Sequence, residues 1–119
     1  MLGFLLVGLG GALGSMARYG VGLALPSIGF PYATLAVNVI GCFAIGLVLP
    51  TMERAVALPL DLRLLLVVGF LGGFTTFSAF GNETIALIRA SGGLALLNVA
   101  ANVLLGLAAV VLGRAIAAG

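Results

Sequence analysis

Four long apolar stretches, separated by short segments rich in proline, glycine or charge, dominate the pattern of this chain. The apolar stretches cover residues 2–25, 32–49, 64–88 and 94–117. An α-helix needs roughly 20 residues to cross a bilayer, so each stretch is about the length of one span. Turn signals fill the separators, which are residues 26–31, 50–63 and 89–93. The pattern predicts an all-α integral membrane protein with one domain, residues 1–119, built from four transmembrane helices with antiparallel neighbours.

Polar groups interrupt the third stretch between Gly69 and Glu83, at a depth where a lipid-facing helix has no use for them. Glycines lower helix propensity, and the hydroxyls of Thr75, Thr76 and Ser78 can divert backbone hydrogen bonds. Irregular backbone at membrane depth is tolerated only where protein or a water-filled path surrounds it. We therefore predict a break in the middle of this helix, where freed carbonyls can meet a cation and amides or hydroxyls can meet an anion.

Two phenylalanines and a glutamate follow the predicted break. Phe77 and Phe80 are spaced i, i+3 and share a helix face, which is normally a packing feature. Beside a polar break, however, the positive edge of each ring can also meet an anion. Glu83 lies about one turn from the end of the stretch, and from there its carboxylate can extend to the membrane interface, where water would solvate it.

Asparagines recur at helical spacing in two other stretches. Thr34 and Asn38 lie one turn apart in the second stretch, as do Asn98 and Asn102 in the fourth. Lipid cannot satisfy an amide, so these side chains either join helices or line a path. Interhelical hydrogen bonds in membranes contribute only about 0.6 kcal/mol each, and for Asn38 the two interpretations stay open.

The first stretch combines small residues with one charge. Gly10 and Gly14 are spaced by four, as are Gly69 and Gly73 in the third stretch, a pattern that lets helix backbones approach closely. Arg18 has three possible roles: it can snorkel to the interface, hold anions in a vestibule or cap another helix. Its position near the end of the stretch favours snorkelling.

Composition supports a membrane protein with little mass outside the bilayer. The chain is 63% hydrophobic and 7% charged, against about 25% charged residues in soluble domains. Scattered charges give no footprint for nucleic acid, and a chain with no histidine and Cys42 as its only cysteine has no side-chain cluster typical of a transition-metal site. No nucleophile–base pair is visible either, so we expect no enzymatic activity.

The arginines give only a weak signal for orientation. Arg54, Arg63 and Arg114 fall on the predicted side of the termini, and Arg18 and Arg89 fall on the other. Positively charged residues are normally concentrated in cytoplasmic loops. Three against two leaves two interpretations: one arginine suffices to orient the chain, or both orientations insert and oppositely oriented copies pair.

Three segments of the chain resemble signature stretches of the Fluc (CrcB-type) fluoride channels. They are GGALGSMARY at 10–19, ATLAVNVIG at 33–41 and GGFTTFSAF at 72–80, and the resemblance extends over the whole chain. It implies a fluoride-selective channel that passively exports cytoplasmic fluoride across a bacterial or archaeal plasma (inner) membrane. It also implies an antiparallel, dual-topology homodimer with two pores and a structural Na⁺ at the dimer interface.

The resemblance also implies roles for individual residues. Backbone carbonyls of Gly72 and Thr75 would hold the Na⁺, and Arg18, Thr34 and Glu83 match vestibule or neighbouring positions. The resemblance places Asn38, Phe77 and Phe80 in the pore. For a fluoride channel we also assign Ser78, Asn98 and Asn102 to hydrogen bonding with the ion. The chain departs from the usual family pattern at Ala79, where a hydroxyl is common, and at Asn98 and Asn102, where a tyrosine and a serine are common.

Two other classes of function compete with this interpretation. Small four-span exporters of cationic drugs use a membrane-embedded glutamate in the first span, but this first stretch contains no acidic residue. A non-transporting assembly subunit would use its glycines and asparagines only to bind partner helices. That alternative leaves the cluster of glycine, threonine and phenylalanine in the third stretch unexplained.

Overall fold

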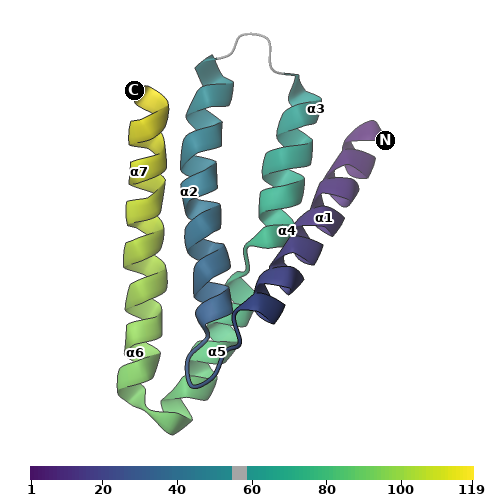
Figure 1. Cartoon of the computed structure of the whole chain (residues 1–119). Helices are drawn as coiled ribbons and strands as arrows, with labels where there is room; N and C mark the ends of the chain where they lie inside the picture. The colour runs from purple at the N-terminus through teal and green to yellow at the C-terminus, as the bar shows by residue number, and fades with distance from the viewer. Residues whose placement is uncertain (55–58) are drawn as a thin grey trace.

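The computed structural model describes residues 1–54 and 59–119, and helices make up nearly all of them (Figure 1). The first two spans are the continuous helices α1 (Leu2–Ala24) and α2 (Tyr32–Arg54). Four pieces form the third span: α3 (Leu60–Arg63), the π-helix η1 (Leu64–Leu71), α4 (Gly72–Phe74) and α5 (Phe77–Ala90). The fourth contains α6 (Gly92–Ala100), the π-helix η2 (Ala101–Leu105) and α7 (Gly106–Ala118). All four are long and apolar enough to cross a membrane, which confirms the predicted all-α architecture.

The separators differ in length from those predicted. Helix α2 continues through Pro50 to Arg54, because a proline in the last turns of a helix removes only one backbone donor. The predicted separator 50–63 also includes residues 55–58, which lie outside the described residues. Between α5 and α6 the turn shrinks to Ser91, whose Oγ accepts a hydrogen bond from the amide of Leu94 at 3.3 Å and so caps α6.

The third span breaks at Thr75 and Thr76, as the glycines and hydroxyls predicted. Both residues have extended backbones, with φ/ψ of −85°/157° at Thr75 and −149°/116° at Thr76. The hydroxyl of Thr75 donates to the carbonyl of Leu71 at 2.9 Å, and the hydroxyl of Thr76 caps α5 by accepting from the amide of Ala79 at 3.2 Å. The chain leaves α4 through this segment and enters α5, which crosses the lower end of α2 in Figure 1.

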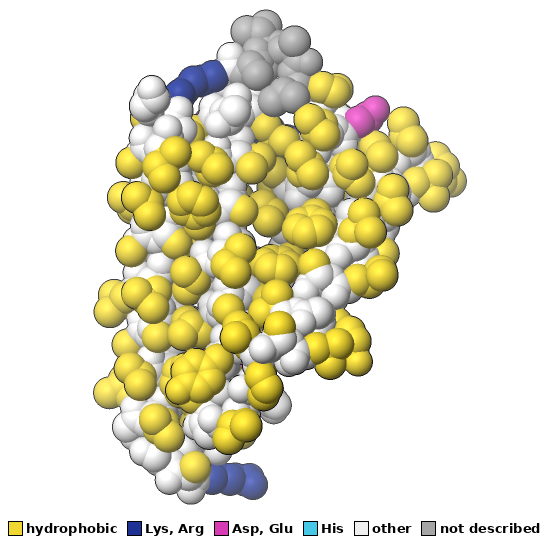
Figure 2. All heavy atoms as spheres, in the orientation of Figure 1, with side chains coloured by type: hydrophobic (Ala, Val, Ile, Leu, Met, Phe, Trp, Pro, Cys, Tyr) yellow, Lys and Arg dark blue, Asp and Glu magenta, His cyan; other side chains and the backbone are white. Residues whose placement is uncertain are grey.

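Glycines allow the helices to pack in two close pairs. A Cβ atom at Gly46 of α2 or at Gly113 of α7 would meet the backbone of the other helix. The same holds where Gly10 and Gly14 of α1 lie against the third span, so the predicted small-residue contacts are confirmed there. Outside these contacts the surface is apolar, with charged groups only near the two ends of the face in Figure 2. The two pairs leave hollows beside the broken third span.

Candidate functional site

Asn38 holds the broken backbone of the third span. Its Oδ1 accepts a hydrogen bond from the Thr76 amide at 2.9 Å, and its Nδ2 donates to the Thr76 carbonyl at 3.1 Å. Thr76 has left the helical ladder, and unpaired backbone groups at membrane depth are costly. The side chain of Asn38 therefore supplies both partners that the helix no longer provides.

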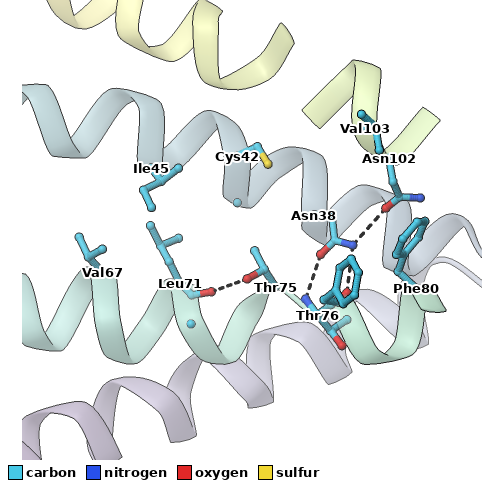
Figure 3. A pocket seen from close by; sticks show the side chains of 13 residues that line it. Asn38, Cys42, Ile45, Val67, Leu71, Thr75, Thr76, Phe80, Asn102 and Val103 are labelled. Carbon is cyan, nitrogen blue, oxygen red and sulfur yellow. Dashed lines mark hydrogen bonds between the residues drawn. The ribbon is translucent and has the colours of Figure 1, made fainter. Parts of the chain in front are cut away.

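A row of amides extends from Asn38 into the fourth span. Nδ2 of Asn38 also donates to Oδ1 of Asn102 at 3.1 Å, so Asn38 lies between Thr76 and Asn102 (Figure 3). Nδ2 of Asn102 in turn donates to the backbone oxygen and to Oδ1 of Asn98, at 2.9 and 3.0 Å. Asn102 belongs to η2, and π-helical turns of this kind often occur at functional sites. The asparagines thus join helices, and two of them also line a hollow.

That hollow has a volume of about 420 Å³ and lies between α2, the third span and η2. Its polar lining comes from Asn38, Thr75, Thr76 and Asn102, and its aromatic lining comes from Phe77 and Phe80. We call it the amide–aromatic hollow. The ring centroids of Phe77 and Phe80 are 5.5 Å apart and the rings are tilted by 52°, as their shared face predicted. Phe77 is 81% exposed, so most of its surface is left uncovered by the rest of the described chain although its ring lines the hollow.

A second hollow, of about 470 Å³, lies on the other side of Thr76, which lines both. We call it the charged hollow, because Arg18 and Glu83 line it together with Thr34. The Thr34 hydroxyl donates to Oε1 of Glu83 at 2.8 Å, while Oε2 of Glu83 is buried without a hydrogen-bond partner among the described residues. Glu83 is therefore held by a contact within the protein, and the expectation that it reaches the membrane interface stays a prediction.

Arg18 caps a helix. Its Nε donates to the Gly73 carbonyl at 3.1 Å, at the end of α4 where the break removes the helical donors. Of the three roles that the sequence left open, the structure shows the contact of a helix cap, and the snorkelling interpretation stays a prediction. The close glycine contacts between α1 and the third span bring the guanidinium within reach of that carbonyl.

Three residues singled out in the sequence lie outside the amide–aromatic hollow. Ser78 is exposed, and its Oγ lies 3.5 Å from Oγ1 of Thr76. Asn98 is fully buried and lines neither hollow. Ala79 lines the charged hollow together with Arg18 and Glu83 and is not among the residues that line the amide–aromatic hollow.

Thr84 is a residue that the sequence interpretation missed. Its Oγ1 accepts from Nδ2 of Asn98 at 2.9 Å and donates to the carbonyl of Phe80 at 2.7 Å. The only sequence signal is a hydroxyl one turn after Phe80, directly after the polar residues Asn82 and Glu83. Such threonines usually bond only within their own helix, so the contact with Asn98 had no local signature.

Besides the Gly73 carbonyl, which accepts from Arg18, the break leaves the carbonyls of Gly72 and Thr75 without their helical donors. In a continuous helix the amides of Thr76 and Ala79 would bond to Gly72 and Thr75, but they donate to Asn38 and to the Thr76 hydroxyl instead. Oxygen ligands of this kind suit a hard cation. In residues 1–54 and 59–119, no group of three His, Cys, Asp or Glu side chains is placed to hold a metal ion. The residues present at the break thus fit a cation held by backbone oxygen.

Four spans around a broken helix, with a polar and aromatic hollow at the break, define a small multi-pass membrane protein with the features of an ion pathway. The model of the family described as "CrcB-like protein, Camphor Resistance (CrcB)" matches residues 5–114, and the chain belongs to this family. It is 48% identical to the fluoride-specific ion channel FluC of Rhizobium etli (strain CIAT 652) over 123 aligned positions, which cover 98% of this chain and 96% of that protein. The FluC protein of Solibacter usitatus (strain Ellin6076) is 49% identical over 118 positions, which cover 96% and 97%.

Proposed function

We propose that this chain is a passive, fluoride-selective channel in the plasma (inner) membrane of a bacterium or archaeon. The observation that carries the proposal is the amide–aromatic hollow, in which the amides of Asn38 and Asn102 face two tilted phenylalanine rings at the break of the third span. The relatives named as fluoride-specific ion channels support the same ion.

Fluoride is small and strongly hydrated, so a selective pore must replace its water with well-placed donors in a narrow bore. Asn38 and Asn102 would supply amide N–H groups, and Phe77 and Phe80 would present the positive edges of their rings. Arg18 and Thr34 place a cation and a hydroxyl in the charged hollow, on the opposite side of Thr76. Glu83 lies in the same hollow and takes the Thr34 hydroxyl proton, so Arg18 would be the group that attracts an anion there before it meets the amides.

The channel would work as an antiparallel homodimer with two pores. Phe77 is 81% exposed in the single chain, and Gly72 at the break is also exposed. An inverted second copy would cover the open side of the amide–aromatic hollow and complete its wall. The weak arginine asymmetry is compatible with insertion in both orientations.

A Na⁺ ion at the dimer interface would be held by the carbonyls of Gly72 and Thr75. Both have lost their helical donors, which is what makes them suitable ligands. The ion would add positive charge beside the pore and tie the two copies together.

Efflux from liposomes tests the proposal. Purified protein should release fluoride far faster than chloride, and Phe77→Ile or Phe80→Ile should slow fluoride release without dissociating the dimer. Omitting Na⁺ during purification should reduce the rate. Equal release of both halides, or release of neither, would contradict the proposed function.

A further inference from the structure

Thr84 and Asn98 line neither hollow, yet they close a ring of hydrogen bonds around the proposed pore. The ring starts at the backbone of Thr76, at the beginning of α5, and passes through Asn38 and Asn102. It continues through Asn98 and Thr84 and ends on the carbonyl of Phe80, again in α5. Phe77 and Phe80 lie on the same helix that carries both ends of the ring.

The backbone at both ends fixes the direction of every bond in the ring. The amide of Thr76 can only donate and its carbonyl can only accept, so the amide of Asn38 has one possible orientation. At the other end, the carbonyl of Phe80 takes the hydroxyl proton of Thr84 and leaves that oxygen free to accept from Nδ2 of Asn98. From both directions, Asn102 must present Oδ1 to Asn38.

In this orientation, the N–H groups of Asn38 and Asn102 are already bonded to acceptors within the protein. The Nδ2 of Asn38 donates to the carbonyl of Thr76 and to Oδ1 of Asn102. The Nδ2 of Asn102 has two acceptors, both on Asn98. An anion can therefore gain an N–H of Asn38 only by displacing one of its two acceptors, and of these the amide oxygen of Asn102 belongs to a side chain, whereas the Thr76 carbonyl belongs to the backbone.

We propose that Thr84 and Asn98 are positioning residues that hold Oδ1 of Asn102 on Asn38 as an internal competitor for the permeating anion. The proposal rests on the proposed channel function and deepens it. Fluoride concentrates its charge in a small volume and is a strong acceptor, so it displaces an amide oxygen. Chloride is larger and a weaker acceptor, so the ring discriminates against it at this point.

Thr84→Val tests the ring because valine has the shape of threonine but no hydroxyl. Without that hydroxyl, Nδ2 of Asn98 loses its acceptor, so the side chain of Asn98 no longer holds its Oδ1 on Asn102. The amide of Asn102 is then oriented only by the Asn98 carbonyl and by Asn38, which is a weaker hold than in the complete ring. We expect the ratio of fluoride to chloride efflux to fall about tenfold, the equivalent of about 1.4 kcal/mol or one hydrogen bond. Thr84→Ser retains the hydroxyl and should keep the ratio.

Thr51→Val is the matched control. The Thr51 hydroxyl donates to the Leu47 carbonyl at 2.7 Å, the same bond within a helix that Thr84 makes to Phe80, but at the far end of α2 and outside the ring. Its efflux ratio should equal that of the unmodified chain. Retention of selectivity in Thr84→Val, or an equal loss in Thr84→Ser, would overturn the proposal.

A spectroscopic measurement tests the positioning without any flux. The chain contains four asparagines and no glutamine, so a ¹H–¹⁵N spectrum shows only four side-chain amide pairs. Three belong to the ring, and exposed Asn82 is an internal reference. Without fluoride, Thr84→Val should move the pairs of Asn98, Asn102 and Asn38 but not that of Asn82, and Thr84→Ser should restore them.

The two measurements separate the inference from the proposed function. Unchanged amide resonances of Asn98 and Asn102 in Thr84→Val would overturn the positioning role, whatever the flux. If the unmodified chain releases no fluoride, the proposed function fails, and with it the role of Oδ1 of Asn102 as a competitor for fluoride. Added fluoride should shift the side-chain amide resonances of Asn38 in the unmodified chain. Unshifted resonances would contradict the displacement of Oδ1 of Asn102 from Asn38 by fluoride.

Discussion

Helix α2 packs against α7 in its C-terminal half and against the break of the third span in its N-terminal half, and the two contacts differ in chemistry. Glycines form the first: Gly46 and Gly113 let backbones approach so closely that no side chain fits between them. Amides form the second, where Asn38 pairs with the backbone of Thr76. Close packing holds regular helices together, whereas an irregular backbone in a membrane needs polar partners. Helix α2 thus packs closely against α7 through a glycine at one end and pairs with the broken backbone through an amide at the other.

Gly46→Leu breaks the glycine contact and should have the largest effect. A Cβ atom there would overlap the backbone of Val110, which cannot move aside as a flexible side chain can. Overpacking typically costs about 1–3 kcal/mol, and because the clash here is with backbone we expect destabilisation of about 3 kcal/mol and loss of monodisperse protein after detergent extraction. Gly20→Leu is the control, because nothing in the chain lies within 4 Å of its Cβ position. Equal behaviour of the two variants in gel filtration and thermal melting would contradict the packing argument.

Asn38→Ala breaks the polar contact. It leaves the amide and carbonyl of Thr76 without partners, at about 1–3 kcal/mol for each buried group. Fluoride efflux should fall by more than tenfold, and the melting temperature should fall as well. Asn82→Ala removes an exposed amide and should change neither. A fully active and stable Asn38→Ala protein would show that water can replace the side chain at the break.

Arg18→Met removes the cap from α4. A hydrogen bond from a charged donor contributes about 1.5–3 kcal/mol, so we expect destabilisation in that range together with slower fluoride entry. Arg18→Lys should restore only part of this, because an ammonium group does not reproduce the geometry of a guanidinium. Arg114→Met, at an exposed position in α7, controls for loss of charge. Identical melting curves for the Arg18 and Arg114 variants would contradict the capping role.

Ala79→Ser sharpens the comparison and should have the smallest effect. This residue lines the charged hollow and is not among those that line the amide–aromatic hollow with Phe77 and Phe80. We expect a stability change within about 0.5 kcal/mol, as for substitutions that disturb no packed or paired group, and nearly unchanged fluoride efflux. A large gain in flux would show instead that the hydroxyl takes part in the ion path.

Much of this architecture was predictable because its causes are local. Runs of apolar residues of membrane length give the four spans, and Gly72-Gly73 followed by Thr75-Thr76 gives the break. The role of Arg18 was not predictable, because it depends on how closely the first and third spans pack through their glycines. For the same reason Thr84 escaped notice: its contact with Asn98 exists only once α5 and α6 have crossed.

The roles of the site residues were only partly accessible from the sequence. Spacing correctly placed Phe77 and Phe80 on one face, and it placed Asn98 and Asn102 one turn apart. Spacing does not say which asparagine faces the hollow, because that depends on the rotation of the fourth span, where η2 interrupts the α-helical repeat. Asn102 lines the hollow, whereas Asn98 is completely buried.

The single-residue turn at Ser91 limits insertions and deletions in this part of the chain. Thr84 and Asn98 are separated by 14 positions, and the single residue between α5 and α6 leaves no slack in that interval. One inserted residue would rotate the rest of the fourth span by about 100°, given 3.6 residues per helical turn, and would carry Asn98 away from Thr84. Working relatives should therefore tolerate insertions and deletions poorly between these two residues, even where the amino acids themselves change.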